Sequence, residues 1–102
     1  MITSSNFRDN HLSALLIGYD WERSEHFAGL TLQEADGHLQ TYSIERLTAW
    51  AVFEDFSAQH IEQCTLLTRP GEVYLSLDPH KEGNRSEQDN FWFVGARIIA
   101  MH

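Results

Sequence analysis

The sequence predicts a mainly β fold, either an antiparallel β-sandwich or a partly open barrel of about six or seven strands, with at most one short helix. The first observation behind this prediction is the segment Cys64–Leu77, whose two halves alternate around a tight turn. Pro70 fixes φ at the first central position of that turn, and Gly71 accepts the positive φ of the second. In this register Leu66 lies opposite Leu75 on an apolar face. The turn and the alternation therefore indicate one antiparallel, half-buried hairpin.

The second observation is another hairpin, which begins with the strand-like segment Phe27–Glu34. We expect Ala35–Gly37 to form a three-residue loop, with Gly37 in the left-handed conformation. A two-residue turn would match the residues of the two strands less well. The three-residue loop predicts these opposed residues: Leu32 with Gln40, Leu30 with Tyr42, and Ala28 with Ile44.

Three more segments complete the predicted sheet. Leu12–Trp21 is an apolar run without a helix cap, and its Gly, Tyr and Trp residues favour a strand that ends in a turn. Leu47–Phe56 fits both helical spacing and alternation, but its Trp, Val and Phe content favours a strand over Leu47–Phe53. Phe91–Ala100 is apolar on both faces for part of its length, which predicts a central strand or a covered edge.

Residues 1–102 are expected to form one globular domain, because a chain of 102 residues holds a single core. Between the last two predicted strands, the segment Pro79–Asn90 carries charges of both signs and has no apolar side chain from His80 to Asp89. We therefore expect an exposed, flexible loop with nothing to bury.

Fifteen acidic residues against seven basic ones give the chain a net charge of −8. Phosphate backbones require a basic face, so this composition argues against direct nucleic-acid binding. The acidic residues are scattered from Asp9 to Asp89, as on any solvated surface, but a scatter along the chain can still converge on one face. Such a face would attract a basic protein partner or act as a mimic of nucleic acid.

The single cysteine, Cys64, excludes an internal disulfide and lies on the apolar face of its hairpin, as a core residue would. The segment Met1–Asn10 is polar, which argues against a signal peptide. No run approaches the roughly 18 apolar residues of a membrane-spanning helix. We therefore expect a cytoplasmic protein that does not enter a membrane.

The residue types that commonly catalyse reactions or bind metals show no recognisable pattern. The six histidines lack a short ligand spacing, no serine stands in a Gly-x-Ser-x-Gly elbow, and the six glycines are isolated. Glu54 and Asp55 are adjacent, so on a strand their side chains point to opposite faces, a poor arrangement for shared acid–base chemistry. We expect no catalytic residue, no cofactor and no bound metal.

Five residues are the candidates for partner binding: Trp21, Glu22, Glu54, Asp55 and Trp92. A tryptophan near a strand end can anchor a partner, because its ring gives a large contact area at low entropic cost. Together with the carboxylates, the two rings would form an acidic, aromatic surface for a basic protein. An uncovered edge strand would in addition allow a homo-oligomer.

Four stretches give the chain a resemblance to small bacterial β-rich proteins, among them uncharacterised families and polymorphic-toxin immunity proteins: Asn10–Leu12, Asp20–Glu22, Asp55–Ile61 and Phe93–Ile98. The resemblance implies a small, acidic, intracellular protein-binding module that is immunity-like and has no catalytic activity of its own. It assigns no catalytic residue. The alternative function is small-ligand binding or catalysis in a pocket at the mouth of a β-barrel.

Overall fold

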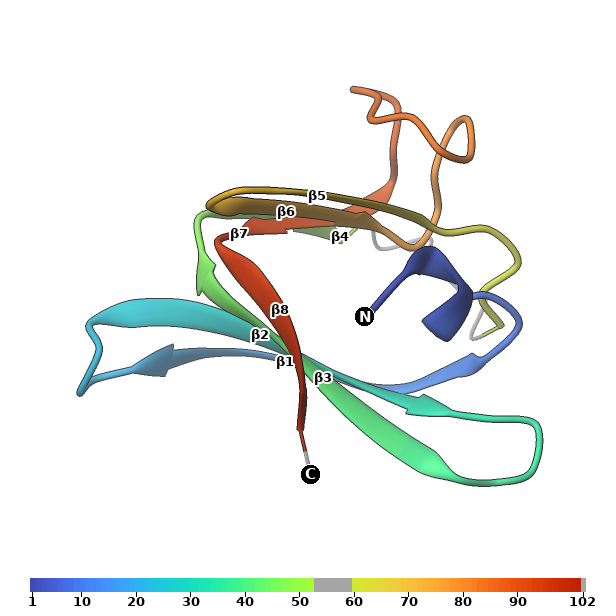
Figure 1. Ribbon diagram of the computed structural model, residues 1–102, viewed down its shortest axis with the longest axis horizontal. Coiled ribbons are helices and arrows are strands. Elements are labelled where there is room, and N and C mark those ends of the chain that lie inside the picture. The colour runs from blue at the N-terminus through green and yellow to red at the C-terminus, as the bar shows by residue number, and fades with distance from the viewer. Residues whose placement is uncertain (53–59, 102) are drawn as a thin grey trace.

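The computed structural model describes residues 1–52 and 60–101, which form two antiparallel sheets of four strands each (Figure 1). The strands of sheet A lie in the order β1 (His11–Asp20), β2 (Glu25–Gln33), β3 (Leu39–Leu47), β8 (Arg97–Met101). Those of sheet B lie in the order β4 (Ala49–Val52), β7 (Phe91–Gly95), β6 (Glu72–Ser76), β5 (Thr65–Arg69). The predicted antiparallel β class is confirmed, and over these residues the sheets do not close into a barrel. Their one helical element is the 3-10 turn η1 (Ser4–Asn6), so no described helix is long and apolar enough to cross a membrane.

Both predicted hairpins have the expected register. In the β5–β6 hairpin Leu66 lies opposite Leu75, and Gly71 in the turn has a φ of 79°. The β2–β3 hairpin closes over residues 35–37, where Gly37 has a φ of 89°. Its opposed residues are those predicted: Leu32 with Gln40, Leu30 with Tyr42, and Ala28 with Ile44. In both hairpins the turn residues therefore set the pairing.

The two sheets are joined at a corner, where the chain passes directly from one sheet into the other. Only Thr48 separates β3 from β4, and only Ala96 separates β7 from β8. The Thr48 N–H donates to the Val94 carbonyl at 2.9 Å. The Ala96 N–H donates to the Glu45 carbonyl, also at 2.9 Å. The hydrogen-bonded ladder of β4 and β7 thus continues round the corner into that of β3 and β8 (Figure 1).

This corner corrects the predicted number of strands. We expected one strand over Phe91–Ala100, but the chain bends at Ala96 and forms both β7 and β8, so the described residues contain eight strands instead of six or seven. The bend also explains why the segment is apolar on both faces. Phe93 is buried in the core from sheet B, whereas Ile98 packs against the core from sheet A after the alternation has changed phase.

The ambiguous segment Leu47–Phe56 is a strand where the structure describes it, because β4 covers Ala49–Val52. Leu47 ends β3 and is buried in the core. The rest of the segment, from Phe53 on, lies outside the described residues.

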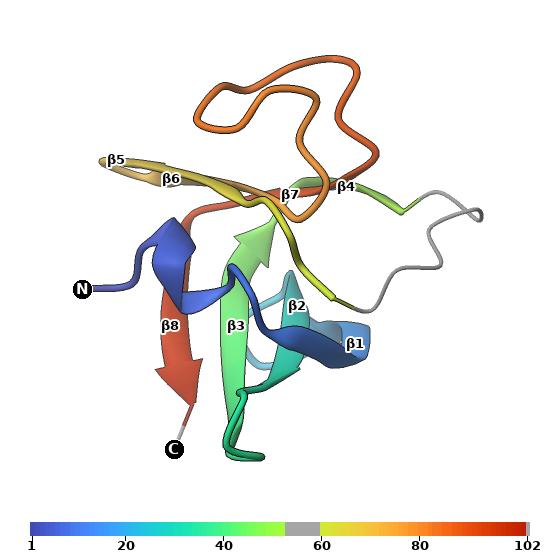
Figure 2. The same cartoon turned by 90° about the vertical axis from the view of Figure 1, so that its right-hand side faces the viewer.

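The core lies between the two sheets and is covered along one side by two further segments (Figure 2). Phe7 follows η1 and is fully buried, with its ring centroid 4.8 Å from that of Tyr42. Ile61 is buried as well, and its carbonyl accepts a hydrogen bond from the Asp9 N–H at 2.6 Å. The sheets supply further fully buried large apolar side chains: Leu30, Leu32, Ile44, Val73, Leu75 and Phe93.

Gly95 stands where the corner leaves no room for a side chain. A Cβ atom added there would lie 2.5 Å from Ile44 Cγ2 and 2.9 Å from the Glu45 carbonyl oxygen. The carbonyl belongs to the backbone of β3 and cannot rotate away. The close approach of β7 to β3 therefore requires glycine.

We predict that Gly95→Ala lowers the free energy of unfolding by about 1–3 kcal/mol, because the added methyl group forces the two strands apart. Urea or thermal unfolding measures this change. Gly29→Ala is the matched control, since a Cβ atom there would meet nothing closer than 3.9 Å, and we expect no loss of stability. Equal stabilities of the two variants would show that the corner accepts a side chain.

Candidate functional site

The segment Pro79–Asn90 folds over the outer face of sheet B (Figures 1 and 2). Its anchor is Asp89, which is only 1% exposed. The Asp89 carboxylate accepts a hydrogen bond from the Tyr74 hydroxyl of β6. It also accepts hydrogen bonds from the backbone N–H groups of His80 at 2.8 Å and Ser86 at 3.3 Å. The expectation that this loop has nothing to bury is therefore wrong for Asp89, because the carboxylate collects donors from both the loop and the sheet.

A second anchor ties the same loop to the start of β5. The Glu82 carboxylate accepts hydrogen bonds from the Cys64 N–H and from Arg8 Nε, both at 2.9 Å. The Gly83 N–H donates to the Thr65 hydroxyl oxygen at 2.9 Å. The bond from the Cys64 N–H, followed by that from Arg8, holds the pKa of Glu82 below its usual value. Glu82 therefore stays ionised and keeps both acceptor oxygens available.

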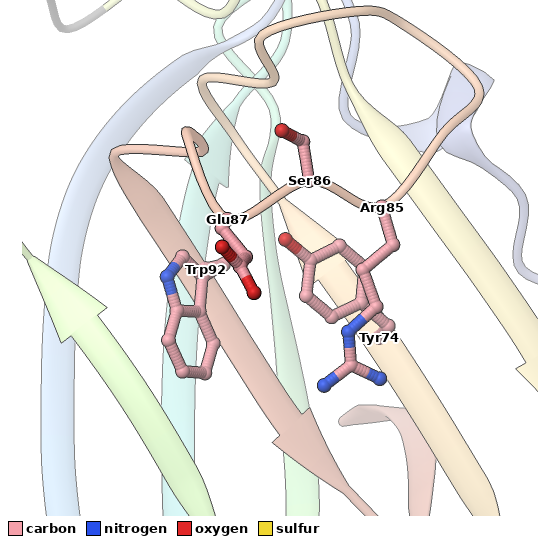
Figure 3. A pocket seen from close by; sticks show the side chains of 5 residues that line it. All are labelled: Tyr74, Arg85, Ser86, Glu87 and Trp92. Atoms are coloured by element: carbon pink, nitrogen blue, oxygen red, sulfur yellow. The ribbon is translucent and has the colours of Figure 1, made fainter.

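An open cavity of about 360 Å³ lies between the loop and sheet B, and we call it the groove. The rings of Tyr74 and Trp92, from the paired strands β6 and β7, stack with their centroids 6.2 Å apart and their planes at 27°. In Figure 3 the Glu87 side chain reaches down between these two rings. The residues lining the groove are Tyr74, Arg85, Ser86, Glu87 and Trp92. A second cavity of about 290 Å³ adjoins it at Tyr74 and Arg85 and is also lined by Leu67, Thr68, Arg69 and Glu72.

The two charged side chains of the groove differ in their partners. The Arg85 guanidinium lies over the Tyr74 ring, 4.6 Å from its centroid, and one of its nitrogens is 3.6 Å from a Glu72 carboxylate oxygen. The hydrogen bond from Arg69 holds the pKa of Glu72 below its usual value, and the charge of Arg85 lowers it further. Glu87 has no arginine or lysine partner in the described part of the chain. Among the described residues that line the groove, Glu87 therefore carries the unpaired charge.

The remaining basic side chains are largely neutralised by the chain itself. Each of the six arginines lies within 3.9 Å of a carboxylate oxygen. The largest group gathers at one end of sheet A, where Glu25 and Glu45 lie among three arginines: Arg23, Arg46 and Arg97. The charges that stay unpaired on the surface are therefore mostly negative.

The structure separates the five predicted partner-binding residues. Trp92 lines the groove. Trp21 and Glu22 lie in the turn between β1 and β2, where Trp21 is 84% exposed. No described contact joins Trp21 to Trp92. Glu54 and Asp55 lie outside the described residues.

Trp21 belongs instead to a row of aromatic rings at the end of the β1–β2 hairpin. The Tyr19 ring lies 4.7 Å from that of Trp21 and 4.8 Å from that of His26, measured between centroids. The His26 ring in turn lies 6.0 Å from that of Trp50 on β4, so the row connects the two sheets. It is a second exposed aromatic surface, distinct from the groove.

Within residues 1–52 and 60–101, no group of three or more His, Cys, Asp or Glu side chains is placed to hold a metal ion. The ring centroids of His11 and His60 lie 5.0 Å apart, and His60 Nε2 lies 3.8 Å from an Asp9 carboxylate oxygen. Cys64 is buried, and burial raises the pKa of its thiol to about 12. The thiolate that nucleophilic chemistry needs is therefore scarce at neutral pH.

Sequence reasoning missed the loop residues that shape the groove, Arg85, Glu87 and Asp89. One signal was available, because Tyr74 stands on the face of its strand opposite the core, and a covered tyrosine needs a partner for its hydroxyl. A polar loop follows that strand closely in sequence. Composition alone does not tell which of its carboxylates, Glu82 among them, accepts the bond.

Comparisons of the chain with protein-family models, with curated proteins and with solved structures found no match. The resemblance to immunity-like proteins therefore stays a prediction. The functional conclusion rests on the chemistry of the groove.

We predict that Asp89→Asn lowers the free energy of unfolding by about 1–3 kcal/mol, because the amide replaces one acceptor oxygen with an N–H donor, and the His80 and Ser86 N–H groups, which can only donate, then compete for the oxygen that remains. Urea unfolding measures the loss. Asp78→Asn is the matched control, since Asp78 accepts an exposed hydrogen bond from the Asn90 side chain at 3.2 Å. There we expect a change within about 0.5 kcal/mol. Similar losses in both variants would contradict the role of Asp89 as the anchor.

Stability should also fall at alkaline pH. The thiol of Cys64 has a pKa raised by burial from its ordinary 9.0 to about 12, so the unfolded chain loses this proton first as the pH rises. Burial and the Asp89 carboxylate likewise raise the pKa of Tyr74, which acts in the same direction. We expect the free energy of unfolding to decrease from about pH 9 to about pH 12 and the decrease to be shallower in Cys64→Ala. An unchanged slope in that variant would show that the thiol does not contribute.

Proposed function

We propose that this protein is a small binding module that holds a basic segment of a partner protein in the groove between Trp92 and the loop 79–90. The observation that carries the proposal is the Glu87 carboxylate beside the Trp92 ring, without a cation of the described chain to neutralise it (Figure 3). An aromatic face and a carboxylate together attract a lysine or arginine side chain, because the ring quadrupole and the negative charge both favour a cation. The partner would supply the missing counter-charge.

The neighbouring Tyr74 supports this assignment. Arg85 already occupies the Tyr74 face, so the chain itself makes the kind of cation–ring contact that we propose for the partner at Trp92. Glu72 lies 3.6 Å from Arg85 and offsets its positive charge. The repulsion between Arg85 and an incoming basic side chain is therefore reduced.

The charge of the whole chain favours the same class of partner. With all six arginines paired, the net charge of −8 acts on the surroundings as a negative field. Such a field speeds the association of a basic ligand, and salt weakens it over a Debye length of about 8 Å at physiological ionic strength. Because Cys64 is a free thiol, we propose a partner in a reducing compartment, the cytoplasm. In an immunity-like role, that partner would be a toxin.

A small cationic ligand is the second candidate occupant. The cavity of about 360 Å³ falls within the range of roughly 300–1,000 Å³ that small-molecule sites have. The pocket we expected for this function was at a barrel mouth, and the described sheets do not form a barrel. A small ligand would therefore use the same groove as the peptide.

A titration with model peptides tests the proposal. We expect a short peptide of alternating lysine and serine to shift the indole N–H resonance of Trp92, and its counterpart with glutamate in place of lysine to leave it unchanged. Glu87→Gln should weaken the lysine peptide about two- to fivefold, the effect of one exposed ion pair. The measurement is a series of NMR spectra of the labelled protein at low and high salt.

Glu62→Gln is the control, because it removes the same charge from an exposed residue that does not line the groove. Equal weakening in the two variants would mean that net charge alone attracts the peptide, which contradicts the groove as the site. Binding of the glutamate peptide would assign the groove to anions through Arg85 and overturn the proposal. Equal affinity for lysine amide and for the peptide would favour the small ligand.

A further inference from the structure

The β1 edge of sheet A is a surface separate from the groove, which lies on sheet B. β1 is the outermost strand and pairs with β2 on one side only. On its other side the described residues make one bridge, from His60 to His11 at the start of the strand. The register with β2 shifts between Leu12 and Ala14 and is regular from Ala14 to Asp20. Along these residues the backbone of β1 has no other described strand beside it.

This edge lacks the features by which natural edge strands avoid pairing, namely charges, prolines and short length. The stretch from Leu12 to Tyr19 contains no charged residue and no proline. Leu16 is 61% exposed on it. Over the described residues the other edge strands are shorter, with four residues in β4 and five each in β5 and β8. In addition, β8 begins with Arg97 and β5 ends with Arg69.

We propose that β1 pairs antiparallel with β1 of a second copy of this chain, about a two-fold axis at Ile17. Ile17 is the middle residue of the regular segment Ala14–Asp20, so every residue of this segment lies opposite a residue of the same segment in the other copy. Leu16 of each copy then lies opposite Gly18 of the other. Opposed residues stay on the same face of the sheet, as the pleat requires. The two A sheets would become one continuous sheet.

Gly18 provides a complementary contact in this register. Phe27 lies opposite Gly18 on β2, and its ring covers the glycine, since a Cβ atom there would lie 2.5 Å from Phe27 Cζ. Leu16 of the second copy would therefore pack against this ring. The two-fold axis creates this contact twice and buries Leu16, which is more exposed than the other large apolar side chains of β1.

Local charge does not oppose a second copy at this edge, although each copy is negative as a whole. The chain has a net charge of −8, but no carboxylate lies between Asp9 and Asp20 in sequence. In the proposed register Asp20 faces Ala14 and not another carboxylate. An edge of this length buries less than the roughly 1,200 Å² of a stable interface, so the dimer should form only at micromolar to millimolar concentration. The groove lies on sheet B and stays open in the dimer.

Sedimentation velocity across that concentration range tests the proposal. We expect a monomer at low concentration and a dimer at high concentration. Leu16→Lys should abolish the dimer, because it removes the apolar contact and places a lysine in the middle of the edge strand, where natural sheets use lysine to prevent pairing. Leu39→Lys is the matched control, since Leu39 is 57% exposed and does not lie on β1, and it should leave the dimer intact. Circular dichroism checks that both variants fold.

A cross-linking experiment tests the register. Mild oxidation of a mixture of Ala14→Cys and Asp20→Cys should give a disulfide-linked dimer, because these two positions lie opposite each other. Each variant alone should cross-link much less, and the buried Cys64 does not compete. A monomer at every concentration would overturn the proposal, as would a dimer that Leu16→Lys leaves intact or that both lysine variants weaken equally. Equal cross-linking in the single variants would overturn the axis at Ile17.

Discussion

The structure depends on the backbone ladder that continues round the corner between the two sheets. Two neighbouring strands bend together there, so the donors and acceptors at the bend satisfy one another instead of being left unpaired. The sheets need no long connection on this side, because single residues, Thr48 and Ala96, carry the chain across. These one-residue connections also hold β7 close to β3, so that Gly95 has no space for a side chain.

The position of the groove follows from this corner. β7 contributes Val94 to the hydrogen bonds of the corner and Trp92 to the groove, only two residues away. β6 lies beside β7 and presents Tyr74 at the neighbouring place on the outer face. The loop 79–90 joins these two strands, so it returns over the face that they share. Sheet geometry therefore places both rings, and the loop adds the charges.

The sequence was informative where a local rule couples neighbouring residues. Gly37 and Gly71 determine their turns, and the turns determine the register of the strands on either side. The bend at Ala96 escaped prediction, because alternation tells which face is apolar but not which sheet that face belongs to. Asp89 escaped it because one of its donors, Tyr74, is fifteen residues away. Trp92 was the one groove residue that we predicted from the sequence, because a tryptophan ring is generally suited to anchor a partner.

The tethered loop has a consequence for how tightly the module can bind. Asp89 and Glu82 fix the loop to the sheet in the unbound chain, so Glu87 is held near Trp92 before any partner arrives. The entropy lost in ordering the loop is then part of folding and is not subtracted again from the binding free energy. The module would act as a preorganised receptor, and the flexibility of the partner's segment would set the upper limit of the affinity.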